Sequence, residues 1–172
     1  SGGGAGACGG QERPRSMTAG TEDVMKAQYL GHVVFYVKDL ERSLAFYRDL
    51  LGFKEVGRIF NGAASALTSG RTHHELLLIQ VGEGPGPGPG RRRGLYHIGI
   101  KVGDHLDDLR RAKRELEEAG VTIDGMSDQT VSQSLYLRDP DGIEVELYVD
   151  ADEALWKANP AAVLSPIKPL QL

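Results

Sequence analysis

Cysteine is almost absent from this sequence, because Cys8 is the only one among 172 residues. A single cysteine excludes a disulfide bond within the chain and any zinc site built from several cysteines. The sequence also lacks an apolar run long enough to cross a bilayer. Its first residues lack the apolar core that a signal peptide carries. These absences predict a cytoplasmic protein that does not bind membranes.

An excess of positive charge is absent as well. The chain has 20 Lys and Arg against 24 Asp and Glu, a net charge of −4. It therefore lacks the basic surface that a general nucleic-acid-binding protein needs. The hydrophobic fraction of 40% and the charged fraction of 26% are typical of a globular protein. A chain of this length forms one ordinary domain or two small modules that share a core.

Two glycine-rich segments fit neither a helical nor a strand pattern. Residues 1–27 are too rich in glycine, serine and charge to bury an apolar surface, and they predict a disordered tail in which Cys8 has no role. Residues 82–94, "GEGPGPGPGRRRG", alternate proline with glycine, which neither a helix nor a strand tolerates. They predict a linker, and its three arginines are expected to be solvated.

The linker separates two halves of the chain that resemble each other. His32 begins an alternating apolar run in the first half, and His97 does the same 65 residues later (32 to 97). In each half a valine follows the histidine by five residues, and an aspartate follows that valine by two. An internal repeat of this kind indicates two copies of one structural unit.

Each half has the pattern of a strand, a helix and three more strands. Asp39 and Asp104 are candidate N-caps, and Gly52 and Gly120 stand where the two helices are expected to end. Shorter runs with a period of two follow each helix, as expected for strands. Each half is therefore predicted to be a β-α-β-β-β module.

A module of this size is marginally stable alone, so the two are expected to pair. We predict an α+β protein in which the modules, residues 28–81 and 95–150, form a cup-shaped, eight-stranded mixed sheet. Residues 151–172 lie beyond the repeat and contain Trp156 among proline-punctuated apolar residues. They predict a C-terminal strap that packs on the body or on a neighbouring subunit.

Three residues of the repeat are candidate metal ligands. The equivalent histidines His32 and His97 begin corresponding strands, and Glu146 lies in the last strand of the second module, where an uncompensated charge would be costly. Two histidines and one carboxylate can occupy one face of a divalent metal and leave the other positions open. A lone strand histidine is more often a core residue, and Glu144 lies on the same face as Glu146, so the register decides which carboxylate points inward.

The motifs "GHVVFYVKDLERSLAFYRDLLGF", "YHIGIKV" and "LYLRDPDGIEVELY" resemble the vicinal oxygen chelate superfamily (glyoxalase, bleomycin resistance, extradiol dioxygenase). Among its branches the chain is most similar to small catechol-dioxygenase-like proteins. The resemblance implies an extradiol (meta-cleaving) dioxygenase that acts on a small aromatic vicinal diol, and it implies a homodimer. The implied metal, bound by His32, His97 and Glu146, is Fe(II), with Mn(II), Zn(II) or Ni(II) as alternatives. His74, in "HHELLL", would stabilise bound dioxygen, and Tyr136 would orient a substrate oxygen.

Two alternatives remain open within the same resemblance. Glyoxalase-like and epimerase-like isomerases or lyases use a fourth ligand, a glutamate on the strand of His74, and here that residue would be Glu75. Bleomycin-resistance-type proteins bind small molecules in the same cup without a metal. One departure bears on the choice, since Gln129 stands where dioxygenase-like relatives often carry a histidine that transfers a proton.

Overall fold

The computed structural model describes residues 25–172 of the chain. Most of the predicted tail, with Cys8, lies outside the described residues. Residues 25–32 have no regular secondary structure, and Gly31–Leu172 form one compact unit. Among the described residues, no helix is both long and apolar enough to cross a membrane. The cytoplasmic location stays a prediction.

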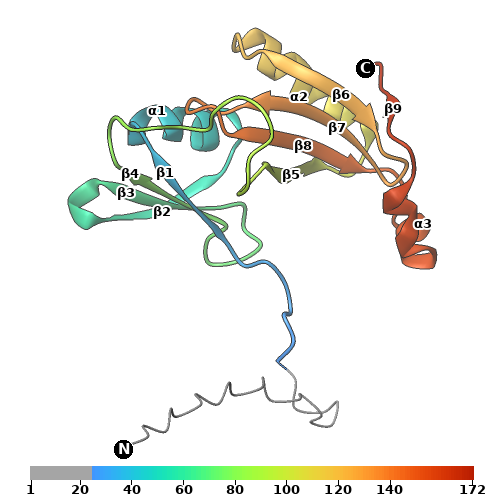
Figure 1. The fold of residues 1–172 in the computed structure, drawn as a ribbon, viewed down its shortest axis with the longest axis horizontal. Coiled ribbons are helices and arrows are strands. Elements are labelled where there is room, and N and C mark those ends of the chain that lie inside the picture. Colours follow the sequence, from blue (N-terminus) through green and yellow to red (C-terminus); the bar gives the residue numbers. More distant parts are fainter. Residues whose placement is uncertain (1–24) are drawn as a thin grey trace, which may run out of the picture. The chain divides into compact units, whose positions relative to one another are not determined.

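The first module contains a four-stranded sheet with a helix between its first two strands (Figure 1). The strand order is β1-β4-β3-β2, with β1 parallel to β4 and the other pairs antiparallel. The elements are β1 (Val33–Val37), α1 (Leu40–Leu44), the π-helical turn η1 (Ala45–Leu50), β2 (Lys54–Ile59), η2 (Phe60–Gly62), β3 (Ala64–Thr68) and β4 (Leu76–Gln80).

The second module repeats this plan, with strand order β5-β8-β7-β6 and β5 parallel to β8. A short C-terminal strand, β9, adds to β6 as a fifth strand, so part of the predicted strap packs on its own chain. The elements are β5 (His97–Gly103), α2 (Leu106–Glu118), β6 (Ile123–Asp128), β7 (Ser132–Arg138), β8 (Glu144–Asp150), α3 (Glu153–Ala158), η3 (Pro160–Leu164) and β9 (Lys168–Pro169).

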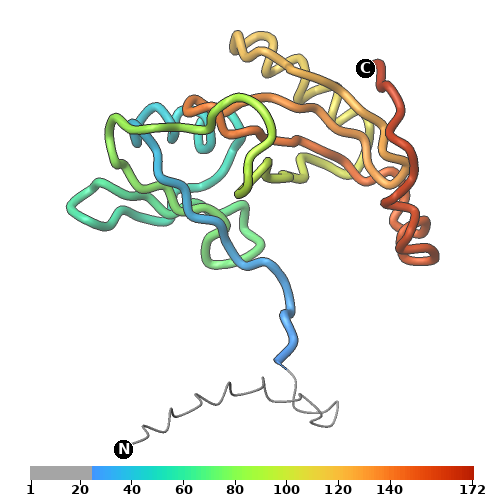
Figure 2. The backbone as a smooth tube through the Cα atoms, viewed as in Figure 1, coloured from blue at the N-terminus to red at the C-terminus, as the bar shows by residue number. Residues whose placement is uncertain are grey.

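The α+β class and the two βαβββ modules are confirmed, but the strands do not join into one eight-stranded sheet. They form one sheet of four strands and one of five, and β1 and β5 do not pair with each other. Figure 2 shows the linker, in lime green, passing between the modules. Sheet pairing depends on contacts between distant segments, which a local alternating pattern does not determine.

Local signals set the helix ends. Asp39 caps α1, because its side chain accepts a hydrogen bond from the backbone N–H of Arg42 at 2.8 Å. Gly52 and Gly120 follow the helices with φ of 81° and 73°, a region that glycine adopts without steric cost. The prediction that Asp104 is an N-cap was wrong, because α2 begins one residue later than expected and His105 is its N-cap.

One cluster of buried side chains runs through both modules. The inward faces of the strands and of the two helices supply it, as their apolar spacing predicts. Its fully buried members include Leu44, Tyr47, Leu67, Leu78, Leu109, Leu135, Leu137, Val145, Leu147 and Val149.

The modules also meet through polar contacts at the turn between β7 and β8. The hydroxyl of Tyr47 donates to Oδ2 of Asp139 at 2.9 Å, and the backbone N–H of Lys38 donates to Oδ2 of Asp141 at 2.8 Å. Arg42 donates to the backbone oxygen of Pro140. These contacts tie the start of the first helix to the Asp-Pro-Asp-Gly turn of the second module.

Candidate metal and substrate site

His97 and Glu146 form the closest pair among the predicted ligands. The parallel register of β5 and β8 places His97 opposite Glu144 and Gly99 opposite Glu146. Nε2 of His97 lies 3.2 Å from Oε2 of Glu146, and the two side chains are 29% and 13% exposed. The repeat and the strand alternation thus bring two of the three predicted ligands together.

Glu144 faces the same histidine from the other side. Its Oε1 lies 3.4 Å from Nδ1 of His97, and its Oε2 lies 3.4 Å from Nη2 of Arg138. Nδ1 of His97 is shielded from solvent and has no hydrogen-bond partner in the part of the chain that the structure describes. The register therefore directs both carboxylates to His97, with Glu146 at Nε2 and Glu144 beside Nδ1.

Glu146 is anchored by its second oxygen. Oε1 accepts hydrogen bonds from the Ser134 hydroxyl at 2.6 Å, from the Tyr136 hydroxyl at 3.1 Å and from Nε2 of Gln129 at 3.3 Å. Burial raises the pKa of Tyr136, and the nearby Glu146 carboxylate raises it further, so the phenol keeps its proton and donates at neutral pH. Tyr136 therefore contacts the predicted ligand itself.

A second cluster contains the histidines of the first module. His32 lies one residue before β1, and its ring centroid is 4.4 Å from that of His74 and 6.4 Å from that of His73. Nδ1 of His73 lies 2.6 Å from Nδ1 of His74. Desolvation lowers the pKa of His74, and the neighbouring imidazoles of His32 and His73 lower it further. His74 is consequently neutral at pH 7, with one ring nitrogen protonated.

Glu75 is engaged by the loop that precedes β4. Oε2 accepts the backbone N–H of Ser69 at 2.8 Å, and Oε1 accepts that of Thr72 at 3.1 Å and the Ser69 hydroxyl at 3.0 Å. Arg71 adds an ion pair at 3.6 Å. Burial raises the pKa of Glu75, but these hydrogen bonds outweigh it and hold that pKa below its usual value. Glu75 thus serves as the acceptor that closes its own loop.

The two modules also differ at the position of the carboxylate ligand. The backbone N–H of Val33 donates to the backbone oxygen of Glu75, and Val33 pairs with Leu76, which places Glu75 opposite His32. Glu144 lies opposite His97 in the same way, so Glu75 corresponds to Glu144 in the second module. Two residues further along β4, Leu77 corresponds to Glu146. An aliphatic side chain cannot bind a metal, so the first module has a histidine but no carboxylate at the ligand positions.

The three predicted ligands do not form one group in the single chain. Among residues 25–172, no group of three or more His, Cys, Asp or Glu side chains is arranged to hold a metal. Glu146 and Tyr136 gather around His97, whereas His74 gathers around His32. The chain therefore presents two partial sites, one in each module.

The His97–Glu146 pair fits a divalent metal. Two ligand atoms about 2.1 Å from one ion and at roughly a right angle lie about 3 Å apart, close to the observed separation. Gly99 adds no side chain beside the pair; a Cβ on it would lie 3.4 Å from the Tyr148 ring and 3.7 Å from Oε2 of Glu146. The donor set of one imidazole and one carboxylate suits Fe(II), Mn(II), Zn(II) and Ni(II).

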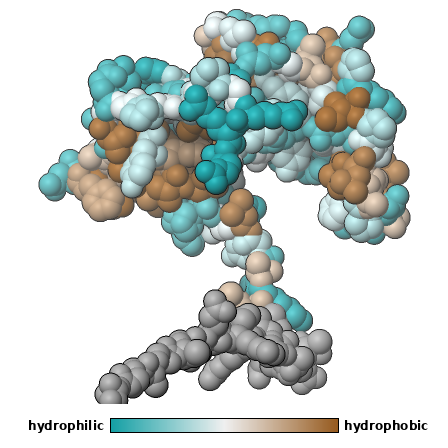
Figure 3. All heavy atoms as spheres, in the orientation of Figure 1, coloured by the Kyte–Doolittle hydropathy of each residue, from teal (hydrophilic) through white to brown (hydrophobic). Residues whose placement is uncertain are grey.

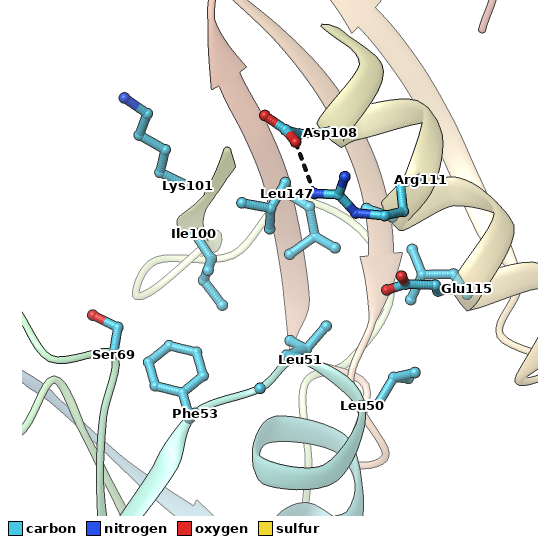
Figure 4. Close-up of a pocket in the computed structure, with 14 residues that line it drawn as sticks. Leu50, Leu51, Phe53, Ser69, Ile100, Lys101, Asp108, Arg111, Glu115 and Leu147 are labelled. Carbon is cyan, nitrogen blue, oxygen red and sulfur yellow. Dashed lines mark hydrogen bonds and ion pairs between the residues drawn. The ribbon is translucent and has the colours of Figure 1, made fainter. Parts of the chain in front are cut away.

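Two clefts lie elsewhere in the compact unit, and no predicted site residue lines either of them. Figure 4 shows the first, about 270 Å³, where Phe53 and Leu51 face Ile100 and Leu147. The second, about 550 Å³, lies between the linker and the β7–β8 turn.

Sequence reasoning missed the serines of the Glu146 network. Ser134 is two residues before Tyr136, so it lies on the same face of β7. Ser127 lies opposite Ser134 on β6 and contacts the Tyr136 hydroxyl at 3.3 Å. The alternation around Tyr136 could have identified Ser134, but Ser127 depends on pairing that only the fold supplies.

Comparison with known families decides the relationship. The family described as "Glyoxalase/Bleomycin resistance protein/Dioxygenase superfamily" matches residues 29–147. The chain belongs to this superfamily. Among solved structures, a glyoxalase/dioxygenase from Nostoc punctiforme superposes with a TM-score of 0.65 at 20% identity, covering 77% of this chain and all of that one. This likeness shows the shared fold of the superfamily.

Relatives in the superfamily carry different activities in their names. The catechol-2,3-dioxygenase of Bacillus subtilis (strain 168) is 33% identical over 132 residues, 76% of this chain and 45% of the relative. The iron-dependent extradiol dioxygenase of Rhodococcus jostii (strain RHA1) is 30% identical, covering 85% and 52%. Glutathione transferase FosA of Serratia marcescens is 31% identical, covering 71% and 81%. The chain thus spans about half the length of the two dioxygenases.

Proposed function

We propose that this superfamily member is a metal-dependent dioxygenase of the extradiol type that acts on a small aromatic vicinal diol. The observation that carries the proposal is the pair formed by His97 and Glu146, with Nε2 and Oε2 3.2 Å apart and Tyr136 donating to the same carboxylate. Two relatives with dioxygenase names support the same reading.

The third ligand in this proposal is His32 of a second copy of the chain. Within one chain His32 is exposed and lies with His74 rather than with the other two ligands. The face of β1 that carries it also exposes Val34 (45%) and Tyr36 (71%). Figure 3 shows hydrophobic surface over the region of the first sheet. A homodimer that covers this face would bring the two partial sites together.

A three-ligand site is supported over a four-ligand, glyoxalase-like site. Glu75 is occupied by the N–H groups of Ser69 and Thr72, and Leu77 stands at the position that corresponds to Glu146. Three protein ligands leave more positions of a metal open for a diol and dioxygen than four do. Fe(II) is the ion that such a set most commonly holds in oxygenases.

The metal, when bound, would hold the two diol oxygens and lower their pKa. Tyr136 would contribute by fixing the Glu146 carboxylate and by presenting its phenolic oxygen at the edge of the site. His74 lies beside His32, and as a neutral imidazole it would donate one N–H toward the open side of the site. Its role would be to stabilise negative charge that develops during the reaction.

A second candidate is a glutathione-transferase-like reaction. The chain covers 81% of the Serratia marcescens FosA protein, against about half of each dioxygenase. Gln129 also places an amide, which cannot transfer protons at neutral pH, beside Tyr136. This candidate predicts thiol-dependent turnover and no consumption of oxygen.

The test uses untagged protein loaded anaerobically with Fe(II), with metal content measured first. About one ion per chain is expected, and His97→Ala should reduce this at least tenfold while circular dichroism stays unchanged. His105→Ala, which removes an exposed histidine at the start of α2, is the matched control and should keep its metal. An unchanged metal content in His97→Ala would refute the ligand assignment.

Turnover is then measured as oxygen consumption with a panel of catechols. His74→Ala is expected to lower kcat by about 10- to 100-fold with little change in metal affinity, because a hydrogen bond to developing charge acts mainly on the transition state. If no oxygen is consumed and an electrophilic substrate is instead turned over in a glutathione-dependent reaction, the second candidate would replace the dioxygenase.

A further inference from the structure

Gln129 reaches the proposed site from the turn between β6 and β7. Its Nε2 lies 2.5 Å from the Tyr136 hydroxyl, 3.3 Å from Oε1 of Glu146 and 3.4 Å from Oγ of Ser127. An amide oxygen facing the Glu146 carboxylate would be repelled, so the NH₂ group is the end that points inward. The side chain thus offers its two N–H donors to a group of three oxygen atoms in the site.

The contacts divide the two oxygens of Glu146 between two roles. Oε1 already accepts from Ser134, Tyr136 and Gln129, so its lone pairs are taken up by donors of the protein. Within residues 25–172, none of these three donors reaches Oε2, which faces Nε2 of His97. Only one oxygen is therefore free to bind an ion.

The turn that carries Gln129 is held in an unfavourable conformation. Thr130 has φ of 72°, a region that β-branched residues rarely adopt. The Asp128 side chain accepts the N–H of Thr130 at 2.7 Å, and β9 pairs with the end of β6 at Ser127 and Asp128. Contacts on both sides thus keep the Gln129 side chain directed at the Glu146 network.

We propose that Gln129 is a positioning residue that holds Glu146 as a single-oxygen metal ligand. Its amide occupies Oε1 and supplies the Tyr136 phenol with a donor, so that the phenol turns its own proton to Glu146. The inference rests on the proposed metal site, and it adds a residue that neither binds the metal nor transfers a proton. An amide suits this role because it donates two hydrogen bonds without changing its charge.

Gln129→Met tests the proposal, because methionine keeps the length of the side chain and removes both donors. The matched control is Gln133→Met on β7, which makes the same chemical change on the opposite face of the strand from Ser134. Gln129→His restores one N–H donor and serves as a partial rescue. The readouts are the Kd for Mn²⁺ by calorimetry, the visible absorption of the Co²⁺-loaded protein, and crystal structures of the metal-free proteins.

The Kd of Gln129→Met for Mn²⁺ is expected to rise about tenfold, with Gln129→His between it and the wild type and Gln133→Met unchanged. The Co²⁺ absorption should weaken in Gln129→Met, because a released carboxylate can bind through both oxygens and raise the coordination number. A merely structural role for Gln129 would lower the unfolding temperature without changing this spectrum.

The outcomes separate the two proposals. If the wild type binds no Mn²⁺ or Co²⁺, the metal site fails and the ligand-positioning role of Gln129 falls with it. If the wild type does bind metal, a displaced Glu146 carboxylate in the metal-free Gln129→Met structure supports the role. If the wild type binds metal and Gln129→Met has a Kd within twofold and the same Co²⁺ spectrum, the positioning role is overturned while the metal site stands.

Discussion

At the scale of single residues, one buried hydrogen bond joins the two modules. Tyr47 is fully buried, and its hydroxyl donates to Oδ2 of Asp139. Oδ1 of Asp139 accepts the backbone N–H groups of Asp141 and Ile143 at 2.9 and 2.8 Å. The Asp139 carboxylate therefore organises the β7–β8 turn and binds the first helix to it.

Tyr47→Phe should lower the free energy of unfolding by about 1–3 kcal/mol, because it leaves a buried carboxylate oxygen without its donor. Tyr36→Phe is the control and should have an effect below about 0.5 kcal/mol, because it keeps the aromatic ring of a side chain that is 71% exposed in the single chain. Urea unfolding measures both. Equal effects for the two variants would show that the Tyr47 hydrogen bond adds nothing.

Asp139 also predicts a pH dependence of stability. Burial raises the pKa of this carboxyl above its usual 3.8, and hydrogen bonds from Ile143 and Tyr47 oppose the shift only partly. As the pH rises from the unfolded to the folded pKa, the unfolded chain releases the proton while the native state retains it, so the free energy of unfolding decreases. The stabilisation that protonated Asp139 contributes is complete below the pKa of the unfolded chain and is lost above the pKa of the folded chain.

Asp139→Asn removes this titration and keeps an oxygen acceptor in place. The difference in unfolding free energy, wild type minus Asp139→Asn, should therefore fall as the pH rises from about 3 toward neutrality. Taking the difference cancels the other carboxylates, such as Asp49 and Asp108, whose pKa values are lowered and whose stabilisation fades in acid. A constant difference across this range would contradict the raised pKa.

At the scale of elements, the loop before β4 depends on Glu75. Glu75→Ala removes the acceptor of two backbone N–H groups and one hydroxyl, and should cost about 1–3 kcal/mol in unfolding free energy. The number of ions bound per chain should not change. Glu83→Ala is the control, because that side chain is 82% exposed. Loss of the ion in Glu75→Ala would instead support a four-ligand, glyoxalase-like site.

The elements themselves were largely predictable from local signals. An N-cap at Asp39 and glycines at 52 and 120 bound the helices because capping and positive φ are properties of a few adjacent residues. The prediction of Asp104 as an N-cap was wrong, because the Asp108 carboxylate accepts hydrogen bonds from the backbone N–H groups of both Asp104 and His105. The first turn of the helix therefore starts one residue later. His74 and Glu75 precede β4, since the Glu75 contacts bend the chain there.

At the scale of the whole molecule, the proposed site needs two chains, and mixing inactive variants tests this. Co-expression of His32→Ala and His97→Ala chains should give about half mixed dimers, each with one intact site of two, so metal content should recover to about a quarter of the wild type. If all three ligands of a site came from one chain, the mixed dimers would recover no metal content.

The matched control pairs His97→Ala with Glu146→Ala. Both changes fall in the second module, so every site of the mixed dimer lacks one ligand and no metal content should return. Recovery in this control would mean that His97 and Glu146 come from different chains, which would contradict their contact at 3.2 Å.

The sequence by itself determined the repeat, the order of strands and helices, and the candidate set His32, His97 and Glu146. These follow from periodicity and capping, which act over a few residues. Gln129 was visible in the sequence only as a departure from the superfamily pattern. Its contacts with Tyr136 and Glu146 belong to the fold.

Only the tertiary structure decided how the candidates are grouped. The strands divide into two sheets, which separates His32 from His97, and the register of β5 on β8 turns both Glu144 and Glu146 toward one imidazole. Such outcomes depend on hydrogen bonds between strands that are distant in the chain, and a shift of one residue would reverse the face of every side chain. The local sequence shows which side chains alternate along a strand, but it does not show which other strand pairs with it or in which register.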